Sequence, residues 1–552
     1  MKNIKKKSQI NLIWHINDLP IKFPSKIRDT YEKIYLKNRK IYTNWVDKNG
    51  KKFSDDIDWW MTSPSFRNPY VSRLLNYFSV IDTLKTFKNE NIKIFTDSEV
   101  FGEIIKNKLG NVNVEINLKK NSRGLLAKLK NYFKSTIYQL IIFSFIKIFK
   151  KKEDISNKKL VLIDKFVTLN QSQNLGYYPK FLNIKKIRIV PTFIPTLNLF
   201  KLIKIFYYLK NNDQKFLYKE QYLKLNDLYF SFTHIFRRKK FLNQKFFYNK
   251  INVSNLIHDE LESYIDFFSI NNGLLNYKFF YRLSKEKVNI FKSFNWFENQ
   301  IIDKGWNLGF RKYFSKNEQN SYGYQDFNKH FNLISNSPSI LEKTSKVIPN
   351  RIIIISNYFK KITNEFTKKQ KIIIAQSERF KKLTRAKVSP LKKRDKILII
   401  LSGIRNIDRA LIDLIKTVCL RNKKIIAFVK PHPILNIDQI ITKKSLPTNL
   451  IVCEEDLIKI LNKSFITITA GPSSALLESV SFRTYNILPE IECGTDMNAK
   501  IFSLKKHEYS LVRNSNELLR AINYIKKNKK NIKIFKRVII NSKSKKLDNF
   551  IN

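Results

Sequence analysis

Residues 430–433 (KPHP) place a histidine between two prolines, directly after an apolar run. Proline restricts the backbone, so the ring of His432 is held in a nearly fixed position. An imidazole and the ammonium of Lys430 are groups that neutralise a departing phosphate. A strand-ending turn whose histidine is satisfied by main-chain carbonyls explains the same four residues, and both readings stay open for this loop alone.

A second loop, residues 471–474 (GPSS), also follows an apolar run and precedes a helical pattern. Gly471 allows close backbone approach, and the hydroxyls of Ser473 and Ser474 lie where a helix would begin. Helix N-termini carry partial positive charge and free N–H groups, which suit a phosphate. An ordinary serine cap accounts for one of the two serines.

The segments that must position these loops alternate between apolar runs and amphipathic stretches. Such alternation predicts a doubly wound parallel sheet. In an open parallel sheet, ligands bind at the carboxyl ends of the strands, so both loops are expected at one binding edge. The expected strands are residues 396–402, 425–429, 450–454 and 465–469, and the expected helices are residues 407–421, 456–463 and 475–481.

Together, the HP and SS loops resemble the donor domain of GT-B glycosyltransferases of bacterial surface polysaccharides. They are most similar to the motifs of polysialyltransferases and glycerophosphate-polymerising enzymes, whose histidine and serines hold the donor phosphate. The resemblance implies this role for His432, Ser473 and Ser474. It departs at residues 482–484 (FRT), where many GT-B domains have Gly-x-Pro.

Three carboxylates near these loops are candidate donor contacts. Glu478 lies four residues after the second serine and either contacts the donor or pairs with solvent or Arg483. Glu490 and Glu492 follow the next strand, where GT-B proteins often place a carboxylate that binds the ribose. Which of Glu490 and Glu492 would bind the ribose is open, and the predicted donor-binding set includes Glu478 and Glu492.

Upstream, residues 296–300 (WFENQ) and 322–325 (YGYQ) look like the WENQ and GYQ elements of a group of surface-carbohydrate biosynthesis proteins. This likeness covers about residues 290–500. Glu298 is a predicted base for an acceptor hydroxyl or, equally, a structural brace. The acidic motif of polysialyltransferases is absent. The predicted acceptor-side residues are Trp296, Asn299, Gln300, Tyr324 and Gln325.

Other chemistries lack their motifs. Asp56 and Asp58 form a DxD pattern, but the context favours a helix N-cap over a metal site. No Walker A loop and no GxGxxG occurs, and the three cysteines have no metal-ligand spacing. We therefore expect no metal and no cofactor beyond a nucleotide-activated sugar as substrate.

The charge of the chain is strongly positive: 104 Lys and Arg against 45 Asp and Glu give +59 over 552 residues. Only 12 glycines occur, and the abundance of Lys, Asn and Ile is typical of an AT-rich coding sequence. The charge therefore indicates general attraction to anionic surfaces, and no specific nucleic acid is expected. Residues 121–155 form a basic amphipathic segment, which predicts either a buried helix or a helix on anionic lipid.

The expected fold is α/β and GT-B-like, with two Rossmann-like domains facing a cleft and a helical insertion in the N-terminal half. No apolar run is long enough to cross a membrane, and the N-terminus lacks the pattern of a signal peptide. The predicted parts are an N-terminal acceptor-side domain (1–350) containing the helical region 200–290, a C-terminal nucleotide-sugar-binding domain (351–530) and a basic tail (531–552).

These features predict a metal-independent, inverting glycosyltransferase that moves a sugar from a nucleotide donor to a surface glycan such as lipopolysaccharide, O-antigen or capsule. The acceptor would be a glycan or a lipid-linked glycan. With few cysteines, the expected setting is cytoplasmic, with peripheral contact to the inner membrane. The alternatives are a nucleotide-sugar epimerase of the same fold and a non-catalytic basic protein that binds nucleic acid or anionic glycan.

Overall fold

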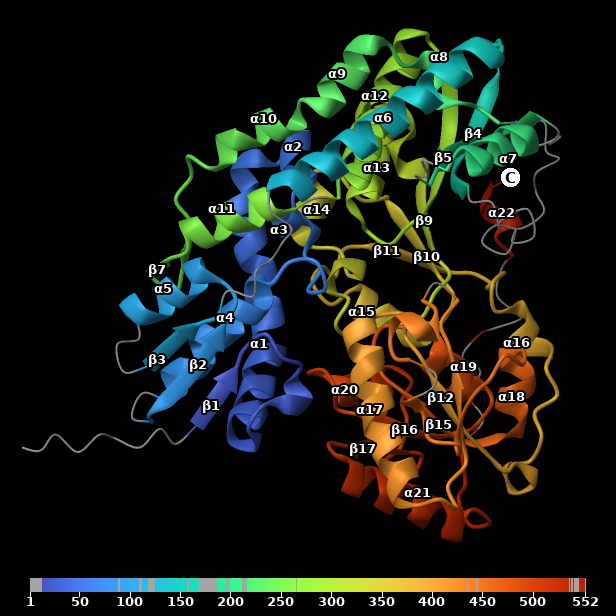
Figure 1. Cartoon of the computed structure of the whole chain (residues 1–552). Helices are drawn as coiled ribbons and strands as arrows, with labels where there is room; N and C mark the ends of the chain where they lie inside the picture. Colours follow the sequence, from blue (N-terminus) through green and yellow to red (C-terminus); the bar gives the residue numbers. More distant parts are fainter. Residues whose placement is uncertain are drawn as a thin grey trace, which may run out of the picture.

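The structure is a computed structural model that describes residues 12–87, 90–108, 112–117, 125–155, 158–167, 186–194, 198–210, 216–264, 266–433, 435–442, 445–535, 537, 540 and 546–551. Three parallel sheets organise the chain, in an N-terminal unit, a central domain and a C-terminal domain (Figure 1). Residues 121–124 of the predicted basic segment lie outside the described residues.

The N-terminal unit is a three-stranded parallel sheet in the order β1-β2-β3. Its strands bury alternate side chains, as in β2, and Trp14 packs edge-on against Phe23 and Tyr31. The strands are β1 (Leu12–His15), β2 (Ile92–Thr96) and β3 (Val112–Ile116), and the helices are α1 (Ser25–Gly50), α2 (Ile57–Trp60), α3 (Ser63–Phe66), α4 (Leu74–Thr86) and α5 (Glu99–Lys108).

The central domain is built on a six-stranded parallel sheet in the order β11-β10-β9-β8-β4-β5. Its inner strands read as continuous apolar runs because helices cover both faces. The strands are β4 (Lys159–Val167), β5 (Ile187–Phe193), β8 (Asn289–Trp296), β9 (Ser321–Gln325), β10 (Arg351–Ile354) and β11 (Lys371–Ile374).

The structure corrects the predicted domain boundary at residue 350. β10 pairs in parallel with β9, placing Ile353 beside Tyr324, and β11 pairs with β10. Both strands were expected in the C-terminal domain, yet they complete the central sheet. The C-terminal sheet begins only at β12 (Lys396–Ile400).

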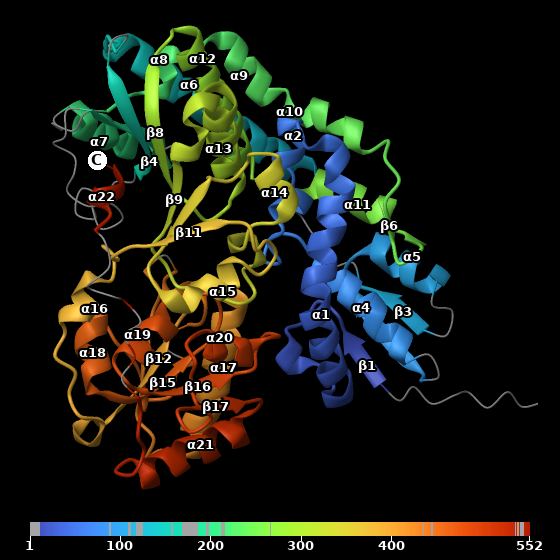
Figure 2. The same cartoon turned by 180° about the vertical axis from the view of Figure 1, so that it is seen from behind.

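In the predicted helical region 200–290, the described residues before β8 form helices and a short hairpin, β6 (Phe247–Tyr248) and β7 (Ile251–Asn252), whereas residues 211–215 and 265 lie outside the described residues. Figure 2 shows α12 and α13 side by side. A Cβ on Gly305 of α13 would lie 1.8 Å from the carbonyl oxygen of Gly273 in α12, so only glycine permits this contact. The helices are α6 (Leu125–Phe149), α7 (Leu199–Lys210), α8 (Lys219–Tyr222), α9 (Leu225–Phe232), α10 (His234–Arg237), α11 (Ser254–Ser263), α12 (Phe267–Lys285), α13 (Ile301–Tyr313), α14 (Ile340–Thr344), α15 (Lys360–Thr363) and α16 (Lys381–Arg385).

The C-terminal domain has a six-stranded parallel sheet in the order β14-β13-β12-β15-β16-β17. Counted along the chain this is 3-2-1-4-5-6, the order of dinucleotide-binding sheets, whose ligand crevice opens between strands 1 and 4. The remaining strands are β13 (Ala427–Lys430), β14 (Leu450–Val452), β15 (Ser464–Thr469), β16 (Tyr485–Pro489) and β17 (Tyr509–Val512), and the helices are α17 (Arg405–Arg421), α18 (Leu457–Lys463), α19 (Ala475–Ser481), α20 (Thr495–Ile501) and α21 (Ser515–Asn528).

The tail returns to the central domain. Arg537 is paired with Glu508 at the C-terminal domain, and the short helix α22 (Asp548–Ile551) lies near β5 and α7 (Figure 1). Leu547 is fully buried, and the Nζ of Lys292 donates to the carbonyl of Phe550 over 3.0 Å. The described residues of the predicted basic tail therefore contact both domains.

The two larger domains meet along the loop that follows β9. Asn328 Nδ2 donates to the carbonyl of Ser473 over 2.7 Å, and Asn332 Nδ2 donates to the carbonyl of Cys493 over 2.9 Å. The carboxyl-terminal edges of two parallel sheets thus face each other. This confirms the predicted α/β class and its GT-B-like arrangement of two Rossmann-like domains.

Candidate functional site

The crevice point of the C-terminal sheet is formed by the loops that follow β12 and β15. Gly471 adopts φ +73°, and a Cβ there would lie 3.0 Å from Oγ of Ser402. A larger residue would push the two loops apart at this point. The glycine of the GPSS loop thus lets the β15 loop close against the β12 loop, at the position predicted from the sequence.

His432 lies on the other side of the β12 loop. Gly403 has φ +85°, and a Cβ there would lie 2.7 Å from Nδ1 of His432, so the ring rests directly on the glycine backbone. Burial lowers the pKa of His432, and the nearby carboxylate of Asp408 partly offsets this. Asp408 itself accepts the backbone N–H groups of Ser402 (2.7 Å) and Gly403 (2.8 Å), so these amides are already engaged.

The GPSS loop reaches the domain interface through Ser473. Ser473 accepts the N–H of Ala475 at 3.3 Å through its Oγ, and its carbonyl accepts Asn328 from the central domain. Ser474 precedes the first residue of α19 and interacts with Glu478 one turn on. Burial raises the pKa of Glu478, while Arg379 and Ser474 lower it.

Arg379 connects the two predicted motifs electrostatically. Its charge acts on both His432 and Glu478. The loop that carries it follows β11 and is held by Asp326, whose carboxylate accepts the N–H of Arg379 at 2.9 Å and the hydroxyl of Tyr324 at 2.7 Å. The central sheet thus places a guanidinium over the edge of the C-terminal sheet.

Lys430 does not share this position. Its Nζ donates to the main-chain carbonyls of Glu454 (3.2 Å) and Glu455 (2.7 Å). These carbonyls belong to the loop after β14, on the outer side of β13. The predicted contact between Lys430 and a donor phosphate is therefore corrected: the lysine braces a neighbouring loop.

Glu492 lies where all three parts of the chain meet. It accepts the hydroxyl of Tyr70, from the N-terminal unit, at 2.7 Å, and also interacts with Asn332 of the central domain. Burial raises its pKa to about 7. By contrast, Glu490 is paired with Arg513 at 2.5 Å. Of the two predicted ribose contacts, Glu492 lines two cavities in this region and Glu490 lines neither of them.

Two cavities share the carboxylate of Glu492. The smaller, of about 20 Å³, lies between Asn328, Gly471 and Ser473 and has room for one water. The larger, of about 500 Å³, reaches from Glu492 to Tyr70 and the loop after β12, a size that suits a small ligand. His432 and Ser474 are not among the residues that line either cavity.

Glu298 lies just after the end of β8. In the central sheet β8 is next to β4, and the strand order reverses between these two strands. Its Oε1 accepts the indole N–H of Trp296 at 2.8 Å, and its Oε2 accepts the amide of Gln300 at 2.7 Å. The negative charge of Glu298 also acts on Lys329, one residue beyond the interface residue Asn328. The carboxylate is half-buried and held from both sides by the residues predicted to flank it.

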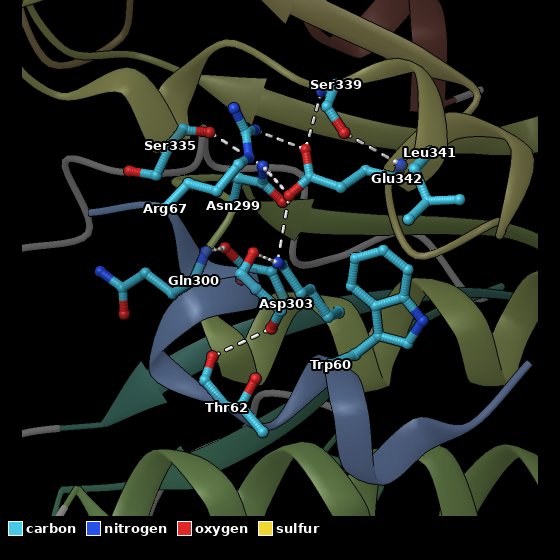
Figure 3. Close-up of polar contacts among 12 residues, drawn as sticks. Trp60, Thr62, Arg67, Asn299, Gln300, Asp303, Ser335, Ser339, Leu341 and Glu342 are labelled. Carbon is cyan, nitrogen blue, oxygen red and sulfur yellow. Dashed lines mark hydrogen bonds and ion pairs between the residues drawn. The ribbon is translucent and has the colours of Figure 1, made fainter. Parts of the chain in front are cut away.

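Three predicted acceptor contacts are fully buried: Asn299, Tyr324 and Gln325 are 0% exposed. Asn299 donates to Ser335 (2.8 Å) and Glu342 (3.0 Å), as Figure 3 shows. The amide oxygen of Gln325 is occupied by the ammonium of Lys329. The structure corrects the predicted sugar contacts of these three side chains, because all three are fully buried inside the protein.

Asn299 belongs to a buried charged group that we call the inner cluster: Arg67, Asn299, Lys304 and Glu342. Arg67 and Lys304 contact the carboxylate of Glu342 at 2.6 and 3.1 Å. Burial lowers the pKa of Lys304 to about 8, while the two cations lower that of Glu342. Figure 3 shows Arg67 and Asn299 converging on Glu342 from different segments. The cluster fastens the N-terminal unit to α13 and α14.

Sequence reasoning missed the loop after β9. His330 in this loop borders the 20 Å³ cavity, contacts Asn498 at 3.0 Å, and has its pKa lowered by burial to about 3. Asn328, Asn332 and Arg379 were also missed. The sequence signal for the two asparagines is the run DFNKHFN directly after GYQ, which the general abundance of Asn and Lys conceals, and Arg379 lies outside this run.

Asp56 is the N-cap of α2 and accepts the N–H of Asp58 at 3.0 Å, which confirms the predicted cap. Within the part of the chain that the structure describes, no group of three or more His, Cys, Asp or Glu is placed to hold a metal ion. The described cysteines are free and buried.

No protein-family model and no curated protein matches the sequence. Solved structures with a similar arrangement include MurG of Acinetobacter baumannii (9% identity, 68% of this chain, 92% of that chain, TM-score 0.37). Another is a UDP-GlcNAc 2-epimerase of Neisseria meningitidis bound to UDP-GlcNAc (11% identity, 68% of this chain, 95% of that chain, TM-score 0.37). A third is UGT89C1 of Arabidopsis thaliana with UDP (10% identity, 71% of this chain, 98% of that chain, TM-score 0.40).

Proposed function

We propose that the protein is a glycosyltransferase that moves a sugar from a nucleotide-activated donor to a glycan acceptor. One observation carries the proposal: the loops after β12, β13 and β15 lie together at the crevice point of a dinucleotide-type sheet and face polar side chains of the central domain. Such a crevice is where open α/β sheets bind phosphorylated ligands.

In this proposal the donor phosphate binds at the crevice beside Ser473, where the facing loops move apart to admit it, because the cavity of about 20 Å³ there has room for one water. Arg379 and His432 stabilise the charge that builds on the departing phosphate, with Arg379 taking the part predicted for Lys430. The interface residue Asn328 fixes the loop that carries Ser473. Glu492 lies at the junction of the two cavities, where it contacts either the ribose or the acceptor.

Two carboxylates compete for the role of base toward the acceptor hydroxyl. Glu298 is the predicted base, and its two hydrogen bonds orient it. Glu492 is favoured by its place beside the 500 Å³ cavity and by a pKa of about 7, close to the value at which a base works best at neutral pH. We propose Glu492 as the base and Glu298 as a positioning residue for the loop after β8.

The proposal also specifies the acceptor, the stereochemistry and the location of the reaction. The acceptor is a surface glycan or its lipid-linked precursor, displacement inverts the anomeric carbon without a metal or another cofactor, and the enzyme works on the cytoplasmic side of the inner membrane. The cavity of about 500 Å³ beside Glu492 gives such an acceptor sugar room next to the donor crevice.

The first test is a thermal-shift screen of the full chain against CMP, UDP, GDP and their sugars. A ligand that binds only the folded protein stabilises it by about 2.7 kcal/mol at a hundredfold excess over Kd. We expect one nucleotide class to raise the melting temperature, with the shift reduced in Arg379→Ala and unchanged in Lys430→Ala. No response to any nucleotide would contradict the proposal.

The second test separates the three functions predicted from the sequence. A transferase consumes the stabilising donor faster when acceptor glycan is added, whereas an epimerase converts it without acceptor. A non-catalytic binding protein consumes none, and its binding is lost at high salt alone. Glu492→Gln should abolish acceptor-dependent turnover while keeping the thermal shift; equal turnover in wild type and variant would exclude Glu492 as the base.

A further inference from the structure

Helix α6 has apolar residues on two opposite faces. Tyr138, Ile142 and Ile146 are buried against the central domain. On the opposite side, a stripe of apolar residues at helical spacing faces solvent. Its members are Leu126 (84% exposed), Leu129, Phe133 (55%), Ile137, Leu140, Ile141 and Ile148 (72%). A helix that only closes a core has one apolar face, so the second face needs another explanation.

Helix α7 continues this surface. It packs beside α6 through stacked rings of Phe145 and Phe206, whose centroids are 3.4 Å apart. Its solvent side also carries apolar residues at helical spacing: Phe200 (78% exposed), Ile203 and Tyr207 (69%). Figure 1 shows both helices on the outside of the central domain. We call the exposed residues of α6 and α7 the outer apolar face.

Basic residues accompany the outer apolar face. Residues 125–152 contain seven lysines and no Asp or Glu, and residues 198–210 contain three lysines and no Asp or Glu. Lys130 and Lys134 of α6 and Lys201 and Lys204 of α7 are exposed. Exposed apolar side chains among lysines match the boundary of an anionic bilayer, where rings and aliphatic chains enter the headgroup region and ammonium groups pair with lipid phosphates.

We propose that the outer apolar face docks the protein on an anionic lipid surface, with α6 and α7 lying in the plane of the bilayer. Among the described helices, none is long and apolar enough to cross a membrane. The sequence left open whether the α6 segment is buried or lies on lipid. In the proposal, one face of α6 is buried against the central domain and the opposite face contacts lipid.

The docked position would also serve the candidate site. Lys128, in the first turns of α6, lines a cavity of about 650 Å³ that shares Arg73 and Tyr77 with the 500 Å³ cavity beside Glu492. A lipid-linked acceptor held at α6 would therefore lead its sugar toward Glu492. This step rests on the proposed function, whereas docking itself does not.

The test is flotation of the full chain with phosphatidylcholine vesicles, with and without phosphatidylglycerol. We expect binding to the anionic vesicles that is about tenfold weaker without phosphatidylglycerol. The variant Phe133→Ser/Ile137→Ser/Phe200→Ser should lose binding, and Lys130→Glu/Lys134→Glu should weaken it about tenfold. Ile426→Ser/Tyr524→Ser removes exposed apolar side chains of the C-terminal domain and should bind like wild type.

Unchanged melting temperatures in all variants are expected because the substituted side chains are exposed. Wild type that fails to float, or a triple variant that floats equally well, would overturn the proposal. So would a dimer in solution that the triple variant converts to a monomer, because a second copy would then cover this face. The flotation assay contains no nucleotide, so a failure of lipid binding and a failure of the proposed glycosyltransferase function can be told apart.

Discussion

The inner cluster and the crevice of the C-terminal sheet are both rich in charged and polar side chains, but they differ in burial and in pairing. Arg67, Lys304 and Glu342 are at most 1% exposed and contact one another. At the crevice, Ser473, His432 and Glu492 are half-buried, and Ser473 and Glu492 border cavities. A closed, paired group stabilises the fold, whereas a half-open group beside a cavity can accept a ligand.

The largest expected effect is on the inner cluster. Glu342→Gln removes the charged partner that Arg67 and Lys304 share, and breaking a buried pair costs about 3–5 kcal/mol. Urea denaturation of the variant should show this loss in the free energy of unfolding. Lys346→Met, which breaks the exposed Lys346–Glu318 pair, should change it by less than about 1 kcal/mol. Equal effects in the two variants would refute the assignment of the inner cluster as a structural brace.

The next effect concerns the glycine under the histidine. Gly403→Ala places a Cβ 2.7 Å from Nδ1 of His432 at a positive φ, so we expect about a tenfold loss of nucleotide affinity with a smaller loss of stability. Isothermal titration calorimetry measures the affinity. Adding His432→Ala removes the clash and should recover part of the stability but none of the affinity. Full affinity in Gly403→Ala would place the ligand away from this loop.

A charge comparison sharpens the account of the crevice. Arg379→Ala should weaken nucleotide binding about tenfold, as expected for the loss of a charge-assisted hydrogen bond. Lys430→Ala should change it less than about twofold, because its ammonium is held by carbonyls of another loop. The reverse order in calorimetry would restore the role that the sequence predicted for Lys430.

The smallest expected effect is the pH dependence of stability through Glu492. Burial raises its pKa from 4.5 to about 7, so the folded protein holds a proton that the unfolded chain has released. Stability from this group is therefore present below about pH 4.5 and falls as the pH rises toward 7. Glu492→Gln carries no charge, so its melting temperature should match wild type at pH 5 and exceed it by about 1–2 °C at pH 8.

Glu454→Gln, an exposed carboxylate on the same domain, serves as the control and should follow wild type at both values. A Glu492→Gln variant that is equally destabilised at pH 5 and pH 8 would show that the carboxylate is ionised at both values. The pKa of Glu492 would then be too low for the proposed role as the base.

Much of the fold could be predicted because the C-terminal strands are buried on both faces and read as apolar runs between turn residues. The same property caused the boundary error: RIII of β10 and KIII of β11 resemble KILII of β12, and nothing local tells which sheet a parallel strand joins. Pairing with β9 depends on chain segments far apart, which a local pattern does not encode.

For the site, the loops were predictable and the individual contacts were not. Gly471 and His432 lie where strand ends placed them. Tyr324 looked like a sugar contact, yet burial makes it a support for Asp326, and through Asp326 for Arg379. The direction of Lys430 and the burial of Asn299 depend on tertiary packing. Arg379 was invisible because it lies outside every motif and comes from the other sheet.

The most direct test of the central claim is hydrogen exchange of the full chain with and without the nucleotide that stabilises it. The account predicts slower exchange in three segments far apart in sequence, residues 402–408, 470–476 and 326–332, because one ligand contacts loops of both facing sheets. Protection confined to other parts of the chain, or in only one of these segments, would contradict the shared crevice and with it the proposed donor site.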